Sequence, residues 1–177
     1  SRGLGDVYKR QGDKIIHNGW RELMDLSAIP FVYEHLEKFE NRIIYYESSR
    51  GCPFSCSYCL SSIDKKLRFR DLELVKKELQ FFLDHRVPQV KFVDRTFNCK
   101  HEHAMTIWKY ILEHDNGVTN FHFEISADLL REEEMELMSQ MRPGLIQLEI
   151  GVQSTNPETI RAIHRHMDLK KLEHCVN

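Results

Sequence analysis

The chain has 177 residues, and its 25 basic and 27 acidic side chains give a formal net charge of −2 at neutral pH. This balance, without a run of lysine or arginine, gives no indication of nucleic-acid binding. No segment approaches the roughly 20 apolar residues that a membrane span requires, and the first residues lack the apolar core of a signal peptide. We therefore expect a cytoplasmic protein with an ordinary hydrophobic core.

Three regions differ in their sequence pattern. Residues 1–11 resemble the translation of a transposon end used in preparing sequencing libraries, so we expect them to be non-native. Residues 12–42 show no sustained hydrophobic period and are expected to be an irregular lead-in. Residues 43–177 carry a regular pattern that ends in a helical segment without a cap. We expect this third region to be an incomplete core domain.

Strands and helices alternate after residue 42. β-branched and aromatic residues predict a strand over residues 42–48, and amphipathic spacing predicts a helix over residues 71–86. The two patterns then repeat, with strands at 89–94, 120–126 and 144–154 and helices at 101–115, 131–141 and 156–165. Four successive strand–helix units predict an α/β fold with parallel strands.

The third predicted strand alternates polar and apolar side chains. His122 and Glu124 share one face, whereas Phe121 and Phe123 share the other. A sheet covered by helices on both sides would be apolar on both faces. The pattern therefore favours part of a TIM-type barrel with a polar lumen over an open doubly wound sheet.

Three of the five cysteines lie in one loop, CPFSCSYC, as Cys52, Cys56 and Cys59. Thiolates at this density select zinc or an iron–sulfur cluster. A four-iron cluster on three cysteines leaves one iron open for a substrate or cofactor. The loop follows the first predicted strand, so it lies at the end of the sheet where α/β folds bind ligands.

A zinc-stabilised α/β binding module without catalysis is the alternative. Structural zinc requires four ligands, and the spacing of the loop supplies three. The candidates for a fourth ligand are Cys99, His101, His103 and Cys175.

The cysteine loop, with Tyr58 before its third cysteine, resembles that of the radical S-adenosylmethionine (SAM) enzymes. The resemblance implies a (β/α)6 partial barrel, of which this chain would hold about the first four units. It implies a [4Fe-4S] cluster on Cys52, Cys56 and Cys59, and S-adenosylmethionine on the open iron beside Tyr58. It also implies reductive cleavage of S-adenosylmethionine to a radical that attacks an unknown substrate, with electrons from a donor such as flavodoxin or ferredoxin.

Residues 151–165 resemble the segment after the fourth strand in the oxygen-independent coproporphyrinogen oxidase branch of that family. There a glutamine, and an arginine twelve positions later, contact the cofactor, and Gln153 and Arg165 occupy these places. Glu124 matches a glutamate that faces the cofactor. Glu149, on the polar face of the fourth strand, is a further candidate for cofactor binding.

The segment after the second strand departs from the family pattern. The family has a glycine-rich turn that holds the methionine amine, whereas this chain has VDRTFN. In place of that turn, the resemblance implies that Asp94 or backbone carbonyls bind the methionine amine. This segment and the cysteine loop together most resemble radical enzymes with a cobalamin-binding domain before the barrel. That implies cobalamin as a further cofactor, held by a domain outside this chain. It also implies that residues 12–42 are the linker from that domain.

Overall fold

The computed structural model describes residues 8–17 and 22–176. The strands are β1 (Tyr8–Gln11), β2 (Lys14–His17), β3 (Ile44–Tyr46), β4 (Ser49–Arg50), β5 (Arg68–Phe69), β6 (Gln89–Phe92), β7 (Asn120–Ile125) and β8 (Ile146–Ile150). The α-helices are α1 (Leu72–Asp84), α2 (His101–Glu113), α3 (Glu132–Ser139), α4 (Pro157–Ala162) and α5 (Leu169–Val176).

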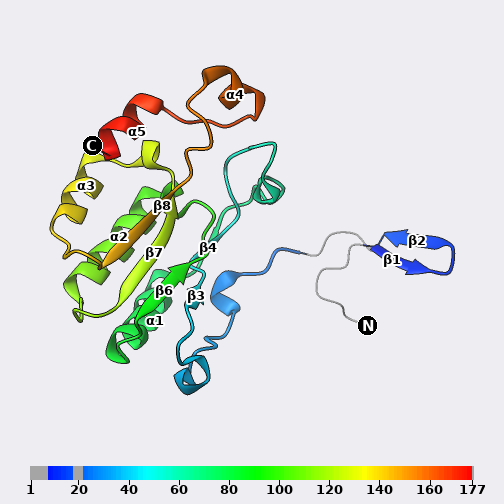
Figure 1. Cartoon of the computed structure of the whole chain (residues 1–177). Helices are drawn as coiled ribbons and strands as arrows, with labels where there is room; N and C mark the ends of the chain where they lie inside the picture. Colours follow the sequence, from blue (N-terminus) through cyan, green and yellow to red (C-terminus); the bar gives the residue numbers. More distant parts are fainter. Residues whose placement is uncertain (1–7, 18–21, 177) are drawn as a thin grey trace.

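The main sheet has four parallel strands in the order β3-β6-β7-β8 (Figure 1). Each new strand is added beside the previous one, with a helix in each connection, as in a βα barrel. Ile44 pairs with Val90, and Phe121 pairs with Ile146. The predicted α/β fold is confirmed, and a partial barrel is consistent with four such units.

Helices α1, α2 and α3 lie against one face of this sheet (Figure 1). Helix α1 begins where the Asp71 carboxylate accepts hydrogen bonds from the backbone N–H groups of Glu73 and Leu74, at 3.0 and 3.1 Å. Its buried stripe includes Val75 and Leu79. The helix therefore turns its apolar side to the sheet and its charged side to water.

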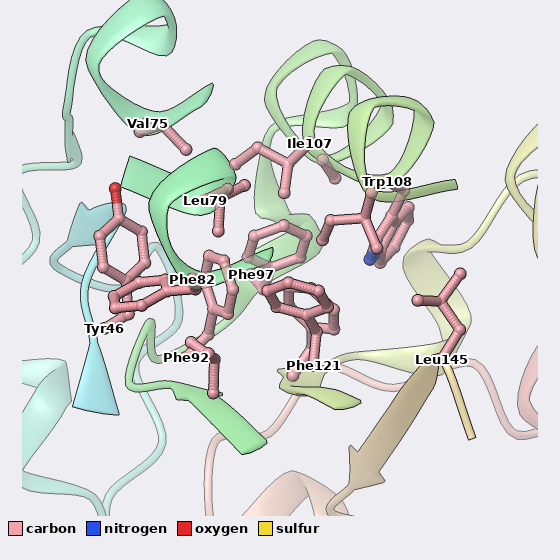
Figure 2. Close-up of a cluster of buried hydrophobic side chains, with 14 of the residues drawn as sticks. Tyr46, Val75, Leu79, Phe82, Phe92, Phe97, Ile107, Trp108, Phe121 and Leu145 are labelled. Carbon is pink, nitrogen blue, oxygen red and sulfur yellow. The ribbon is translucent and has the colours of Figure 1, made fainter. Parts of the chain in front are cut away.

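The core between these helices and the sheet is rich in aromatic rings (Figure 2). Phe92 of β6 and Phe123 of β7 have ring centroids 4.5 Å apart, and Phe97 contacts both rings. Trp108 of α2 packs 5.3 Å from Phe97. Burial of these large rings contributes much of the stability of the sheet, because each removes a large apolar area from water.

The opposite face of the sheet is polar, as the alternation predicted. Along β7 the residues Phe121, Phe123 and Ile125 are buried, whereas His122 and Glu124 are partly exposed. On β8 the exposed positions are likewise the polar ones. This polar face corresponds to the lumen side of a barrel.

Two short antiparallel pairs were not predicted. Strands β1 and β2 form a hairpin, so residues 14–17 of the predicted linker are extended. Strands β4 and β5 pair Ser49 with Phe69 and close the segment that carries the cysteines. The assignment of residues 1–11 to non-native sequence, of 12–42 to a linker and of 43–177 to an incomplete core stays a prediction. Among the described residues, no helix is long and apolar enough to cross a membrane.

Candidate cofactor site

The cysteine loop leaves the sheet through a tight turn at Gly51. Gly51 has φ +96°, and a Cβ atom there would lie 2.6 Å from the carbonyl oxygen of Lys66. Only glycine tolerates both the conformation and this close approach. The next residue, Cys52, donates a backbone hydrogen bond of 3.0 Å to the carbonyl of Asp64. The start of the loop is therefore fixed against residues 64–66.

The three cysteines are free thiols that differ in exposure. Cys52 and Cys56 are buried, whereas Cys59 is partly exposed. Among the described residues, no three cysteine, histidine or acidic side chains are gathered so that they could hold a metal ion. The donor types fit an iron–sulfur cluster. Binding a cluster would require the three sulfurs to converge.

No fourth ligand joins the cysteines in the described part of the chain. Burial raises the pKa of the Cys99 thiol to about 11, so this thiol stays protonated at neutral pH and is a poor ligand. His103 Nε2 lies 3.0 Å from Ser48 Oγ, and His101 lies between Glu133 and Glu134. Cys175 Sγ lies 3.3 Å from the carbonyl oxygen of Ala127, so both histidines and Cys175 have other partners in the structure.

The cysteine loop contacts residues 151–165, the segment for which the resemblance implies contacts to the cofactor. The backbone N–H of Ser57 donates to the carbonyl of Ile163 at 2.9 Å. Arg165 Nη1 donates to the Tyr58 hydroxyl at 3.2 Å, and Arg165 Nη2 donates to the carbonyl of Gly151. Partial burial raises the pKa of Tyr58, against the opposing effect of the Arg165 charge.

Arg165 also has an unused donor. Its Nε atom is buried and has no hydrogen-bond partner in the structure. A buried guanidinium N–H without a partner is costly, so this donor is open to a further acceptor. The structure therefore brings Tyr58 and Arg165 together at the edge of the cysteine loop.

Gln153 lies in the same segment and has a strained backbone. Its φ is +64°, in the left-handed region that a non-glycine residue rarely adopts. Its side chain is exposed, and a Cβ atom on Gly151 would lie 2.5 Å from Gln153 Nε2. Glycine at position 151 thus leaves room for the Gln153 amide at the end of β8.

A charged cluster crosses the polar face of the sheet on three adjacent strands. Lys91 Nζ of β6 lies 3.1 Å from Glu149 Oε2 of β8 and 3.8 Å from Glu124 Oε1 of β7. His122 Nε2 lies 3.0 Å from the same Glu149 oxygen. The hydrogen bond from Lys91 is the main reason that the pKa of Glu149 is lowered.

Sequence reasoning missed Lys91, although it found both glutamates. The signal was available, since Lys91 alternates with the buried Val90 and Phe92 and pairs with His122 in the sheet. A lysine on the lumen face of a barrel strand should be paired with an acid, because a charge there is partly desolvated.

Asp94 follows β6 and is completely buried. Its carboxylate accepts hydrogen bonds from the Ser48 backbone N–H at 3.1 Å, from Ser48 Oγ at 2.8 Å and from Ser49 Oγ at 2.5 Å. Burial raises the pKa of Asp94 to about 6. Its hydrogen-bond partners in the structure belong to the segment that leads into the cysteine loop.

The sequence model of the radical SAM superfamily matches residues 46–177, which is most of the chain. The chain belongs to the radical SAM superfamily. The matched residues include the cysteine loop, the polar face of the sheet and the segment that carries Arg165. The α/β sheet described above is the corresponding part of the radical SAM barrel.

Curated relatives are annotated methyltransferases. The chain is 24% identical over 136 residues to bacteriochlorophyllide d C-12(1)-methyltransferase of Chlorobaculum tepidum, covering 74% of this chain and 29% of that protein. It is 25% identical over 119 residues to the uncharacterized methyltransferase PH0819 of Pyrococcus horikoshii, covering 66% of this chain and 25% of that protein.

A solved structure has the same fold. The radical S-adenosylmethionine methyltransferase TsrM of Kitasatospora setae, with cobalamin and a [4Fe-4S] cluster bound, matches with a TM-score of 0.67 and 18% identity. The match covers 85% of this chain and 29% of TsrM. The chain thus spans less than a third of the length of these proteins.

Proposed function

We propose that this chain is the cofactor-binding part of a radical SAM enzyme. The observation that carries the proposal is the contact between a loop of three free thiols and the segment that contains Arg165, both within the matched region. Cys52, Cys56 and Cys59 would each bind one iron of a [4Fe-4S] cluster. The fourth iron would then be open to the cofactor.

The residues around the loop would bind S-adenosylmethionine. The Arg165 guanidinium, with its free Nε–H, suits the carboxylate of the methionine part. The carboxylates of Glu124 and Glu149 suit ammonium or hydroxyl groups, and the Gln153 amide suits hydroxyl groups. Tyr58 would border the cofactor, and its contact with Arg165 would orient the guanidinium.

Held by Cys52, Cys56 and Cys59, a reduced cluster would supply the electron for reductive cleavage of a C–S bond of S-adenosylmethionine. The chain itself would bind and orient the sulfonium, since the polar face of the sheet carries charges that a bound cofactor can pair with. The buried positions of Cys52 and Cys56 would limit access of water to the cluster.

We further propose methyl transfer as the reaction of the whole protein, because the curated relatives and the structural neighbour are all named methyltransferases. Cobalamin would be a second cofactor, since the TsrM structure contains it. A part of the protein outside this chain would bind it. The electron would come from a small donor such as flavodoxin or ferredoxin. A cytoplasmic location would keep the thiols reduced.

Anaerobic reconstitution with iron and sulfide tests the proposal. We expect a brown protein with about four irons per chain and a broad absorption band near roughly 400 nm, since three cysteines can bind such a cluster. Replacement of Cys56 by alanine should remove the band and most of the iron.

Cys175→Ala is the matched control, because Cys175 is a partly exposed thiol of α5 outside the loop. It should leave the iron content unchanged. A colourless protein that binds one zinc ion per chain would support the zinc-stabilised module instead and would overturn the proposal.

A further inference from the structure

The buried Asp94 carboxylate connects the ends of two neighbouring strands. Asp94 follows β6, and its donors Ser48 and Ser49 follow β3. The pairing of β3 with β6 continues almost to Asp94, because the Val93 N–H donates to the Tyr46 carbonyl at 2.9 Å. One carboxylate therefore accepts three hydrogen bonds from two consecutive residues just before the cysteine loop.

His103 of α2 extends this network. The single hydroxyl proton of Ser48 is donated to Asp94, so the His103 Nε2 atom, 3.0 Å from Ser48 Oγ, must carry a proton and donate it. Burial lowers the pKa of His103 to about 4, so the ring is neutral at neutral pH. The polar groups of this buried network thus satisfy one another.

The network leads directly to Cys52. Ser49 begins the two-residue strand β4, and the tight turn at Gly51 follows. On the other side, the segment after Asp94 brings Thr96 Oγ1 to 3.7 Å from Cys52 Sγ. Cys52 is consequently fixed through the preceding strand β4 and through the segment that follows β6. Only 8% of its surface is exposed.

The far side of the loop is held differently. Cys59 is partly exposed, and the following Leu60 and Ile63 are 84% and 68% exposed. The backbone N–H of Cys59 bonds only within the loop, to the carbonyl of Cys56 at 3.2 Å. Cys59 is therefore less buried than Cys52, although the neighbouring Ser57 and Tyr58 contact Ile163 and Arg165.

We propose that Asp94 is a positioning residue that fixes Cys52 before metal binds. An acceptor-only carboxylate suits this task because all three groups facing it are donors, whereas an asparagine would direct its own N–H groups at one of them. That Cys52 is a cluster ligand rests on the proposed function. The anchoring of Cys52 by Asp94 concerns the metal-free chain and does not depend on cluster binding.

The test is the alkylation rate of each cysteine in the folded, metal-free chain, measured by peptide mass spectrometry. Alkylation of a buried thiol requires local opening, so its rate reports how firmly the residue is held. Asp94→Asn should raise the rate at Cys52 by about fivefold or more, since at least one buried hydrogen bond is lost. The rate at Cys175, in α5, should not change.

Glu134→Gln is the matched control, because Glu134 is an equally buried acid that bonds to His101 and to the start of α3. It should leave the Cys52 rate unchanged. Should Asp94→Asn fail to fold, as judged by circular dichroism, Ser49→Ala removes only one of the three hydrogen bonds and should give a smaller increase at Cys52.

An unchanged Cys52 rate in a folded Asp94→Asn or Ser49→Ala chain would overturn the proposal, as would an equal increase at Cys175. The outcome is separate from that of the proposed function. A Cys52→Ala chain that still binds a full cluster would refute the role of Cys52 as a ligand without affecting the alkylation result.

Discussion

At the scale of single residues, one lysine pairs with both carboxylates on the polar face of the sheet. Lys91 contacts both Glu124 and Glu149 and is the largest influence on the pKa of Glu149. His122 acts on the same carboxylate more weakly. Both glutamates are candidates for cofactor binding, and Lys91 places a positive charge beside both of them.

Lys91→Met should therefore raise the pKa of Glu149 towards its ordinary value, because the carboxylate loses its main hydrogen-bond donor. Carboxyl carbon NMR of the labelled chain across a pH titration measures this directly. His122→Phe is the comparison and should produce a smaller rise. Equal or larger effects of the histidine variant would show that Lys91 is not the dominant partner.

Ionisation of Asp94 should make the free energy of unfolding depend on pH. Its pKa of about 6 in the folded chain lies above the ordinary value of 3.8, because burial disfavours the charged form. Ionisation then costs more free energy in the folded than in the unfolded chain, and this cost develops as the pH rises from about 4 to about 6. Asp94→Asn cannot ionise and avoids the cost.

The free energy of unfolding of Asp94→Asn, relative to that of the parent chain, should therefore increase between about pH 4 and about pH 7. Urea unfolding of both chains at the two pH values measures the change. His103 titrates in both chains, so its contribution largely cancels in the difference. A difference that stays constant or decreases with pH would show that the Asp94 pKa is not raised.

The roles of the individual site residues stay predictions, whereas the structure supplies their partners, which the sequence could not predict. The cysteines and Arg165 were recognised from their motifs, and the structure places Arg165 beside the loop. The partners of Asp94 could not be predicted, because a hydrogen bond to residues 45 and 46 positions away depends on how two strands end in space. Whether Asp94 contacts the cofactor stays a prediction.

At the scale of elements, the segment before β3 is attached through a buried ion pair. Arg70 and Glu78 lie 2.5 Å apart, and Tyr46 donates a hydrogen bond to Glu78 at 2.6 Å. Arg70 also donates to the carbonyls of Leu26 and Ile29. The guanidinium thus joins α1 to residues 26–29, which carried no regular pattern in the sequence.

Arg70→Met should lower the free energy of unfolding by about 3 kcal/mol or more, because it leaves the buried Glu78 carboxylate without its cation. Urea unfolding measures the loss. Lys76→Met is the control, since Lys76 pairs with the exposed Glu73 and solvent screens such a pair, so its loss should change the stability little. Similar losses in the two variants would contradict the importance of the buried pair.

The helices and strands that the sequence placed correctly were those with a strong hydrophobic period. Helices α1 and α2 and strands β6 and β7 lie where the pattern placed them, because each buries one apolar side. Strands β4 and β5 were missed, since each has only two residues and their pairing follows from the path of the cysteine loop. A strand of two residues is too short to show a hydrophobic period in the sequence.

At the scale of the whole molecule, the sheet is open. In the described part of the chain, β8 pairs with β7 alone, and the strand order ends there. An unpaired strand edge is a template for association with other chains. We expect this chain to self-associate as its concentration rises, as observed by size-exclusion chromatography.

Gln147→Lys should reduce that association, because Gln147 is an exposed residue of β8 and a charge on an edge strand opposes pairing. A chain that is monodisperse at every concentration and melts cooperatively would contradict the prediction.

Above all, we propose that three thiols of one loop hold a cluster whose fourth iron accepts S-adenosylmethionine. Electron paramagnetic resonance of the reconstituted, reduced chain tests this claim directly. We predict the signal of a reduced [4Fe-4S] cluster, with g values that shift when S-adenosylmethionine is added and shift less in Arg165→Met. A cluster signal that S-adenosylmethionine does not change, or the absence of any such signal, would contradict the account.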